Sequence, residues 1–342
     1  MKFYPEKFRE LTLPWMPPED ANLLVVEILA PCIQNIHILV KALNESAPLP
    51  DFLLIYSPGE PSDYDYIEAV LSITNSYGIT RVGIYDAGMH LYEPRIKHFP
   101  ASWLGLTGEV PCVDPVPYHE RTTKFCCLNR VARPHRIKLV EEVYRQSLDK
   151  DGLISCGPGN PTYNFDAYAQ PEWLHLFPLQ GDNMGADADT AAFSASTDVM
   201  NCLVNLIPES SIEKVGTHKQ CWERAMLTEK TVKAYMFKQL PIWFAPQYFV
   251  KYQQDLGFDV FDDIIDHNRY DRMEQPYDRI HMIVGELKKL VNRPIEELQQ
   301  LMQSLDARLE ENRSKVARIY QSIELESGES LKNWLGYKSD SK

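Results

Sequence analysis

Short apolar runs alternate with helix-patterned runs along most of the chain, and this alternation is the feature that most restricts its fold. In the first half, the runs 22–28, 52–56 and 81–85 are rich in Leu, Val and Ile, as buried strands are. The segments between them, 33–43 and 66–77, have the spacing of amphipathic helices. Strands that alternate with helices in this way predict βαβ units and a parallel sheet.

The same alternation returns after a Pro- and Gly-rich stretch at 105–121, which we interpret as a linker. Further strands are expected at 124–128, 153–156, 202–207 and 242–245, and further helices at 134–148, 228–238, 249–256 and 277–323. The sequence therefore predicts an α/β protein with two Rossmann-like domains and long C-terminal helices. The expected boundaries are 1–120 for the first domain, 121–290 for the second and 291–342 for a helical tail.

Composition and charge narrow the classes of function. Apolar residues make up 44% of the 342 residues, which is enough for a sizeable core, and the formal net charge is -13. An acidic chain does not attract polyanions through its overall field. The seven cysteines form no CxxC pair, which favours free thiols in a reducing compartment. The first fourteen residues lack the apolar core of a signal peptide, and no apolar run is long enough to span a bilayer, so we expect a cytoplasmic protein without a membrane partner.

A basic cluster directly follows the strand expected at 124–128. Its members are Arg130, Arg133, His135 and Arg136, and Asn129 precedes them. Pro134 is suited to the first position of a helix, where free amides and the helix dipole attract anions. Guanidinium groups match phosphate oxygens, and open α/β sheets bind ligands at the carboxyl ends of their strands. The cluster therefore predicts a diphosphate clamp; the alternative is that its members pair with surface carboxylates.

A second helix start lies at Thr228, which is a good N-cap residue. Lys230 and Lys233 are unusual so near a helix N-terminus, because the dipole disfavours cations there, and an anion between them would offset that cost. Glu229 is suited to bind ribose hydroxyls, and Glu209, at the end of the strand 202–207, is expected to approach the same ligand. An ordinary capped helix and a solvent-facing carboxylate are the alternatives.

Four motifs occur in order: KFCCLNRVARPHR, CLVNLIPES, LTEKTVKAYMFKQLPIWF and YQQDLGFDVFDDIID. Their order resembles glycosyltransferases of the two-Rossmann (GT-B) type, in particular fucosyltransferase-like enzymes and related glycosyltransferases encoded by bacteriophages. The resemblance covers Lys124 to Arg313, and Thr-Glu-Lys at 228–230 is similar to the donor-binding TEK of α1,3-fucosyltransferases. The chain departs from the family pattern at Val232–Ala234, which puts the carry-over of Lys233 in question.

The resemblance implies two domains that face a cleft, with a nucleotide-sugar donor in the second domain and the acceptor selected by the first. It also implies that Glu229 holds the donor ribose and that Arg130, Arg136 and Lys230 face the diphosphate. The donor is then a UDP- or GDP-sugar, and no cofactor is expected.

An inverting transfer needs a base that removes a proton from the acceptor hydroxyl. Glu60 and Asp86, which lie at or after strand ends in the first domain, are the first candidates. The alternatives are Glu27, Asp63 and His90, and a retaining enzyme needs no such base. The strings Asp63-Tyr-Asp65 and Asp187-Ala-Asp189 look like metal-binding motifs, but strings this short arise by chance among 48 acidic residues, so we expect no metal requirement.

The expected activity is the transfer of a hexosyl or pentosyl group from a nucleotide-sugar to a hydroxyl. The acceptor is expected to be a glycan or a modified base in phage DNA, such as a hydroxymethyl pyrimidine. If the acceptor is phage DNA, the protein acts in the cytoplasm of a phage-infected bacterium. The alternative is a non-catalytic nucleotide-binding or assembly protein with the same fold. The sequence leaves the oligomeric state open.

Overall fold

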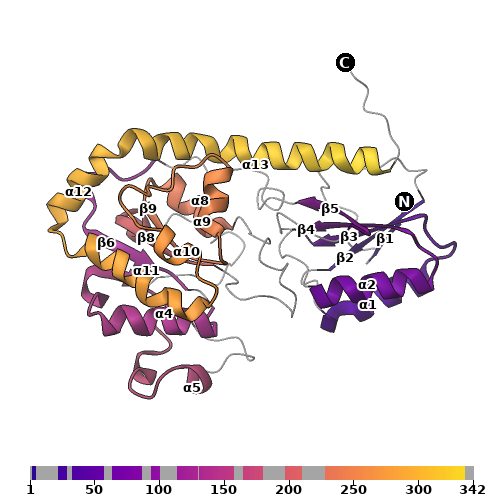
Figure 1. The fold of residues 1–342 in the computed structure, drawn as a ribbon, viewed down its shortest axis with the longest axis horizontal. Coiled ribbons are helices and arrows are strands. Elements are labelled where there is room, and N and C mark those ends of the chain that lie inside the picture. Colours follow the sequence, from indigo (N-terminus) through magenta and orange to yellow (C-terminus); the bar gives the residue numbers. More distant parts are fainter. Residues whose placement is uncertain are drawn as a thin grey trace. The chain divides into compact units, whose positions relative to one another are not determined.

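The computed structural model describes residues 2–4, 22–28, 33–57, 64–86, 94–100, 114–129, 131–157, 165–179, 197–209 and 228–335. These residues form two compact units, each built on a parallel sheet (Figure 1). The first unit contains the described residues up to 100 and the end of helix α13 (Asp306–Trp334), from Ala317 onward. The second contains the described residues 114–209 and Thr228–Val316. The predicted α/β class is confirmed, with a Rossmann-like alternation of strands and helices.

The first sheet has five strands in sequential order, β1-β2-β3-β4-β5, and every neighbouring pair is parallel. The strands are β1 (Lys2–Tyr4), β2 (Leu23–Glu27), β3 (Phe52–Ser57), β4 (Arg81–Asp86) and β5 (Ile96–Pro100). The sequence pattern predicts β2, β3 and β4, together with helices α1 (Ile36–Glu45) and α2 (Tyr64–Ser76). It does not predict β1 and β5, the strands at the two ends of the strand order.

Helices cover both faces of the first sheet. Side chains of α1 and α2 pack with Leu24, Val26 and Ile84 on one face. On the opposite face, Leu331 and Leu335 from the end of α13 pack with residues such as Val25 and Tyr85. The last turns of α13 are therefore part of the first unit and not of a separate helical tail.

The second sheet has four parallel strands in the order β7-β6-β8-β9. The strands are β6 (Thr123–Cys127), β7 (Gly152–Ile154), β8 (Cys202–Pro208) and β9 (Leu240–Phe244), all of which the pattern predicts. Helix α4 (Pro134–Arg145) connects β6 to β7, and α8 (Glu229–Met236) lies between β8 and β9 along the chain. The short elements are η2 (Ile33–Asn35), η3 (Tyr118–Glu120), η4 (Asp149–Asp151), α5 (Phe165–Tyr168), η5 (Leu174–Leu176) and α7 (Thr197–Met200).

Two adjacent aromatic residues of β9 show which helices cover which face, because successive strand residues point to opposite faces. Trp243 Nε1 donates to Thr231 Oγ1 of α8 at 3.1 Å. The Phe244 ring instead meets the ring of His135 from α4, and the Arg279 guanidinium lies over it. Helix α8 thus covers one face, whereas α4 and α11 (Pro276–Val291) cover the other, as Figure 1 shows.

The remaining helices complete the second unit: α9 (Phe249–Asp255), α10 (Asn268–Asp271) and α12 (Ile295–Ser304). The start of α13 also belongs here, because Asn312 Nδ2 donates to Asp259 O and Lys238 forms an ion pair with Asp306. The C-terminal helices 291–342, expected as one separate tail, are therefore divided between the two units. Among the described residues, no helix is long and apolar enough to span a membrane.

Candidate functional site

The second sheet has one topological switch point, between β6 and β8. The chain leaves β6 through α4 towards β7 at one edge, and it leaves β8 towards β9 at the other edge. Ligands of open α/β sheets bind outside the carboxyl ends of the strands at such a point, because the connections diverge there. The residues that follow β6 and β8, which include Asn129 and Glu209, lie at this position.

The carboxylate of Glu209 holds the N-terminus of α8. Thr228 Oγ1 lies 2.9 and 3.0 Å from its two oxygens, Thr231 Oγ1 donates at 3.0 Å, and Lys230 Nζ lies 3.4 Å away. Thr228 is the N-cap of α8, since its Oγ1 also accepts the Lys230 amide. Glu209 is only 2% exposed. The anion that we expect beside Lys230 is therefore present within the chain itself.

The main chain of Glu209 holds the start of α4. Its carbonyl accepts His135 Nε2–H at 3.0 Å and Arg136 Nη2–H at 3.4 Å, and its amide donates to Phe244 O in β9. A single residue at the end of β8 thus ties together the starts of two helices on opposite faces of the sheet. Glu209, expected to approach the same ligand as the start of α8, thus also contacts the start of α4.

Helix α4 begins with one backbone donor that has no partner among the described residues. Arg133 is its N-cap and supplies no side-chain cap, and Pro134 takes the first helical position. The amides of Arg136 and Ile137 bond to Arg133 O, whereas the His135 amide has no partner among the described residues. Uncapped amides and the positive end of the dipole favour an anion at this point. Arg133 is half-buried beside it.

Two members of the basic cluster are buried rather than free. His135 is 5% exposed, and burial, together with the positive charge of Arg136, lowers its pKa to about 3. The expectation that His135 adds positive charge is wrong, because its ring is neutral at pH 7. Arg136 is 4% exposed, and its guanidinium donates to Val131 O at 2.9 Å as well as to Glu209 O. Arg136 therefore shapes the turn before α4.

Asn129 joins the ends of β6 and β7. Its backbone N–H donates to Ser155 Oγ at 3.0 Å, and its side-chain Nδ2 donates to Ser155 O at 2.9 Å. The residue is fully buried, and its Oδ1 has no hydrogen-bond partner in the described part of the chain. Lys233 is half-buried on α8. Arg130, Glu60 and the side chain of Glu229 lie outside what the structure describes.

In the first unit, the predicted base Asp86 is paired with a histidine that the sequence pattern does not single out. Asp86 ends β4 and is fully buried, and its Oδ1 lies 3.0 Å from His98 Nε2 in β5. The alternative base Glu27 ends β2; burial raises its pKa, and its Oε2 has no partner among the described residues. Both carboxylates lie at the carboxyl edge of the sheet.

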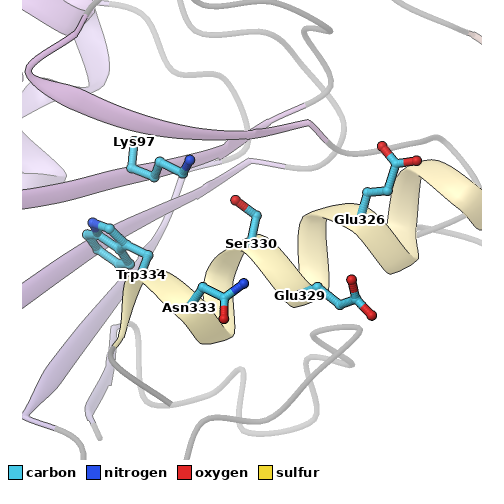
Figure 2. A pocket seen from close by; sticks show the side chains of 6 residues that line it. All are labelled: Lys97, Glu326, Glu329, Ser330, Asn333 and Trp334. Atoms are coloured by element: carbon cyan, nitrogen blue, oxygen red, sulfur yellow. The ribbon is translucent and has the colours of Figure 1, made fainter. Parts of the chain in front are cut away.

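Two cavities lined by described residues belong one to each unit. One of about 300 Å³ follows the end of β9, and its lining includes Tyr248, Asn268 and Asp271. Tyr248 has a positive φ of 63° and is 47% exposed, and burial raises the pKa of Asp271. The other, of about 540 Å³, is an open hollow in the first unit, between Lys97 of β5 and the last turns of α13 (Figure 2).

Comparisons of the chain with protein-family models, with curated proteins and with solved structures find no match. The described residues contain no group of three His, Cys, Asp or Glu side chains that could hold a metal ion. The interpretation of the site therefore rests on its own geometry.

Proposed function

We propose that the protein is a glycosyltransferase of the GT-B type, which binds the diphosphate of a nucleotide-sugar at the switch point between β6 and β8. The observation that carries this proposal is the uncapped start of α4 at that point, where the His135 amide has no partner among the described residues. A helix N-terminus at the carboxyl edge of a parallel sheet is a common anion site.

Charge balance supports the α4 start over the α8 start as the position of the phosphates. At the start of α8, the Glu209 carboxylate already accepts both threonine hydroxyls and lies beside Lys230. At the start of α4 the residue that caps the helix is Arg133, a cation with no side-chain acceptor to offer the amides. A diphosphate here gains from the dipole and from the guanidinium.

The same contacts serve the reaction. When the bond between the sugar and the diphosphate breaks, negative charge grows on the leaving phosphate, and fixed donors stabilise that charge. The proposal assigns the nucleoside to the cavity after β9, where the exposed Tyr248 ring offers a stacking surface. A glycan hydroxyl is the favoured acceptor, because a net charge of -13 opposes binding to DNA.

The test is thermal unfolding in the presence of UDP-glucose, GDP-mannose, ADP-glucose, CMP-sialic acid or inorganic pyrophosphate. A donor at 100 times its dissociation constant stabilises the fold by about 2.7 kcal/mol, which raises Tm by roughly 5–10 °C. Arg133→Ala is expected to reduce that shift, whereas Arg145→Ala, at the exposed far end of the same helix, leaves it intact.

Two results decide against the proposal. If none of the five compounds raises Tm, or if Arg133→Ala retains the full shift, the diphosphate does not bind at α4. If a donor binds, release of its nucleotide (a nucleoside diphosphate, or CMP from CMP-sialic acid) separates the two functions that the sequence leaves open. Slow release in water supports a transferase, and tight binding without release supports a nucleotide-binding assembly protein.

A further inference from the structure

The last turns of α13 carry a polar stripe beside the stripe that they bury in the first unit. In the buried stripe, Leu331 and Leu335 pack on the sheet. Ser327 Oγ of the same stripe donates to Pro100 O of β5 at 2.5 Å. The neighbouring stripe has the helical spacing i, i+3, i+4 and i+7, so its side chains lie on one face. Its members are Glu326, Glu329, Ser330 and Asn333.

This polar stripe lines the open hollow of about 540 Å³ in the first unit. Lys97 of β5 and the ring of Trp334 line the same hollow. In Figure 2, Ser330 and Glu326 point from α13 towards the strand that carries Lys97. The volume is within the range of small-molecule sites, which is about 300–1,000 Å³. The hollow therefore combines one aromatic ring with polar side chains from two elements of the same unit.

The aromatic wall of the hollow is held in place by the fold. The centroid of the Trp334 ring lies 5.1 Å from that of Phe52 and 5.5 Å from that of Phe99, and both contacts are edge-to-face. Gly83 of β4 leaves room for this packing, because a Cβ there would lie 2.8 Å from the Phe99 ring and 3.1 Å from Trp334 Cη2. A ring that is already fixed loses little freedom when a ligand packs on it.

The polar side chains of the hollow are available to a ligand, and their charges restrict its chemistry. No hydrogen bond or ion pair with a described residue is made by Lys97, Glu326, Glu329 or Asn333. The two carboxylates oppose an anion, and the ammonium group of Lys97 opposes a cation. Carboxylates only accept hydrogen bonds and an ammonium group only donates them. The lining therefore suits a neutral ligand that has an apolar face and that both donates and accepts hydrogen bonds.

We propose that this hollow is a carbohydrate-binding site, which holds a sugar ring of a neutral oligosaccharide. The C–H groups on the face of a pyranose ring pack on Trp334. The hydroxyls at its rim donate to the carboxylates of Glu326 and Glu329 and accept from Lys97 and Asn333. Binding at this site needs neither a nucleotide-sugar nor a transfer step, so the inference goes beyond the proposed function and does not depend on it.

The test is a nitrogen-15 NMR titration of the full chain with maltotriose, cellotriose, mannotriose and N-acetylated chitotriose. At least one of them is expected to shift the Trp334 indole N–H and the backbone amides of Ser330 and Asn333, with a Kd of about 1 mM. Asn333→Ala and Lys97→Met each remove one donor and should weaken that binding by about fivefold. Gln321→Ala is the matched control, because it removes an exposed amide of α13 that does not line the hollow, and it keeps the wild-type Kd.

Three results overturn the inference. The first is that none of the four oligosaccharides shifts these signals at about ten times the expected Kd. The second is that inorganic phosphate shifts them and the oligosaccharides do not, because the hollow then selects anions. The third is an oligosaccharide that binds the wild type and both variants, Asn333→Ala and Lys97→Met, with Kd values within about twofold, because the sugar then lies elsewhere. Each result leaves the proposed diphosphate site to its own test.

Discussion

Replacement of Glu209 by alanine is expected to loosen the attachment of α8 to the second sheet. The substitution removes a carboxylate that accepts the hydroxyls of Thr228 and Thr231 and lies 3.4 Å from Lys230 Nζ. Hydrogen bonds to a charged group contribute about 1.5–3 kcal/mol each, so the two hydroxyl bonds alone account for about 3 kcal/mol or more. Removal of one partner of a buried ion pair costs about 3–5 kcal/mol.

The two magnitudes agree, so Glu209→Ala should lower the unfolding free energy by about 3–5 kcal/mol. For a unit of this size the loss corresponds to a fall in Tm of roughly 6–20 °C, measured by circular dichroism. Glu209→Gln keeps one acceptor oxygen but removes the charge beside Lys230, so it should destabilise the fold by less than Glu209→Ala. Asp255→Ala is the control, because its exposed pair with Lys251 contributes at most about 0.5 kcal/mol. A Glu209→Ala variant whose Tm equals that of the Asp255→Ala control would refute the reasoning.

Three further predictions concern stability. Leu331→Ala should lower the unfolding free energy by about 2–5 kcal/mol, since the Leu331 side chain is 1% exposed and packs on the first sheet. The control Leu325→Ala replaces a residue that is 69% exposed and should change the unfolding free energy by less than about 0.5 kcal/mol. Equal effects of the two substitutions in urea unfolding would contradict the packing of α13. Burial lowers the pKa of His135 to about 3 and of His267 to about 4, below the ordinary 6.5, so between these values and 6.5 the unfolded chain binds protons that the folded chain does not. The unfolding free energy should therefore fall from pH 6.5 towards pH 4, by up to about 1.4 kcal/mol per unit for each histidine, and a flat profile would disagree. Gly285→Ala should raise the unfolding free energy by about 1 kcal/mol, because Gly285 lies inside α11 and a Cβ there meets no atom within 4 Å; a lower Tm would contradict this.

The local pattern predicts the interior strands of both sheets, but not the two end strands of the first. Interior parallel strands are buried on both faces, so β3 and β8 are nearly continuous apolar runs. Strand β5, Ile-Lys-His-Phe-Pro, mixes polar and apolar residues and ends in proline, so its sequence alone does not distinguish it from a loop. It becomes a strand because it pairs with β4, and its pattern contains no signal for that pairing.

The site is predictable in place but not in detail. The ends of β6 and β8 follow from the strand pattern, and Thr228 is predicted as the N-cap of α8. The pairing of Glu209 with Lys230 depends on strand order, which joins residues far apart in the chain. His135 and Arg136 are buried and both donate to the carbonyl of Glu209, so local charge alone overestimates the positive charge available to a ligand.

The sequence pattern predicts Asp86 but not its partner His98, and the reason is again that strand pairing is not visible in the local pattern. Asp86 is identifiable because it follows an obvious strand, whereas His98 is on a strand that the pattern does not show. One useful signal is the position of a histidine two residues before the proline that ends β5, but it becomes informative only once the register with β4 is known.

An NMR titration with UDP or GDP, followed at backbone amides, tests the diphosphate site most directly. The His135 amide at the start of α4 is expected to shift as the nucleotide binds, because it has no partner among the described residues. The Tyr277 amide at the start of α11 is the matched control, since α11 also begins with a proline and has no side-chain cap but does not follow a strand at the switch point. A shift at His135 without one at Tyr277 is the predicted result; nucleotide binding that leaves the His135 amide unmoved would contradict the account.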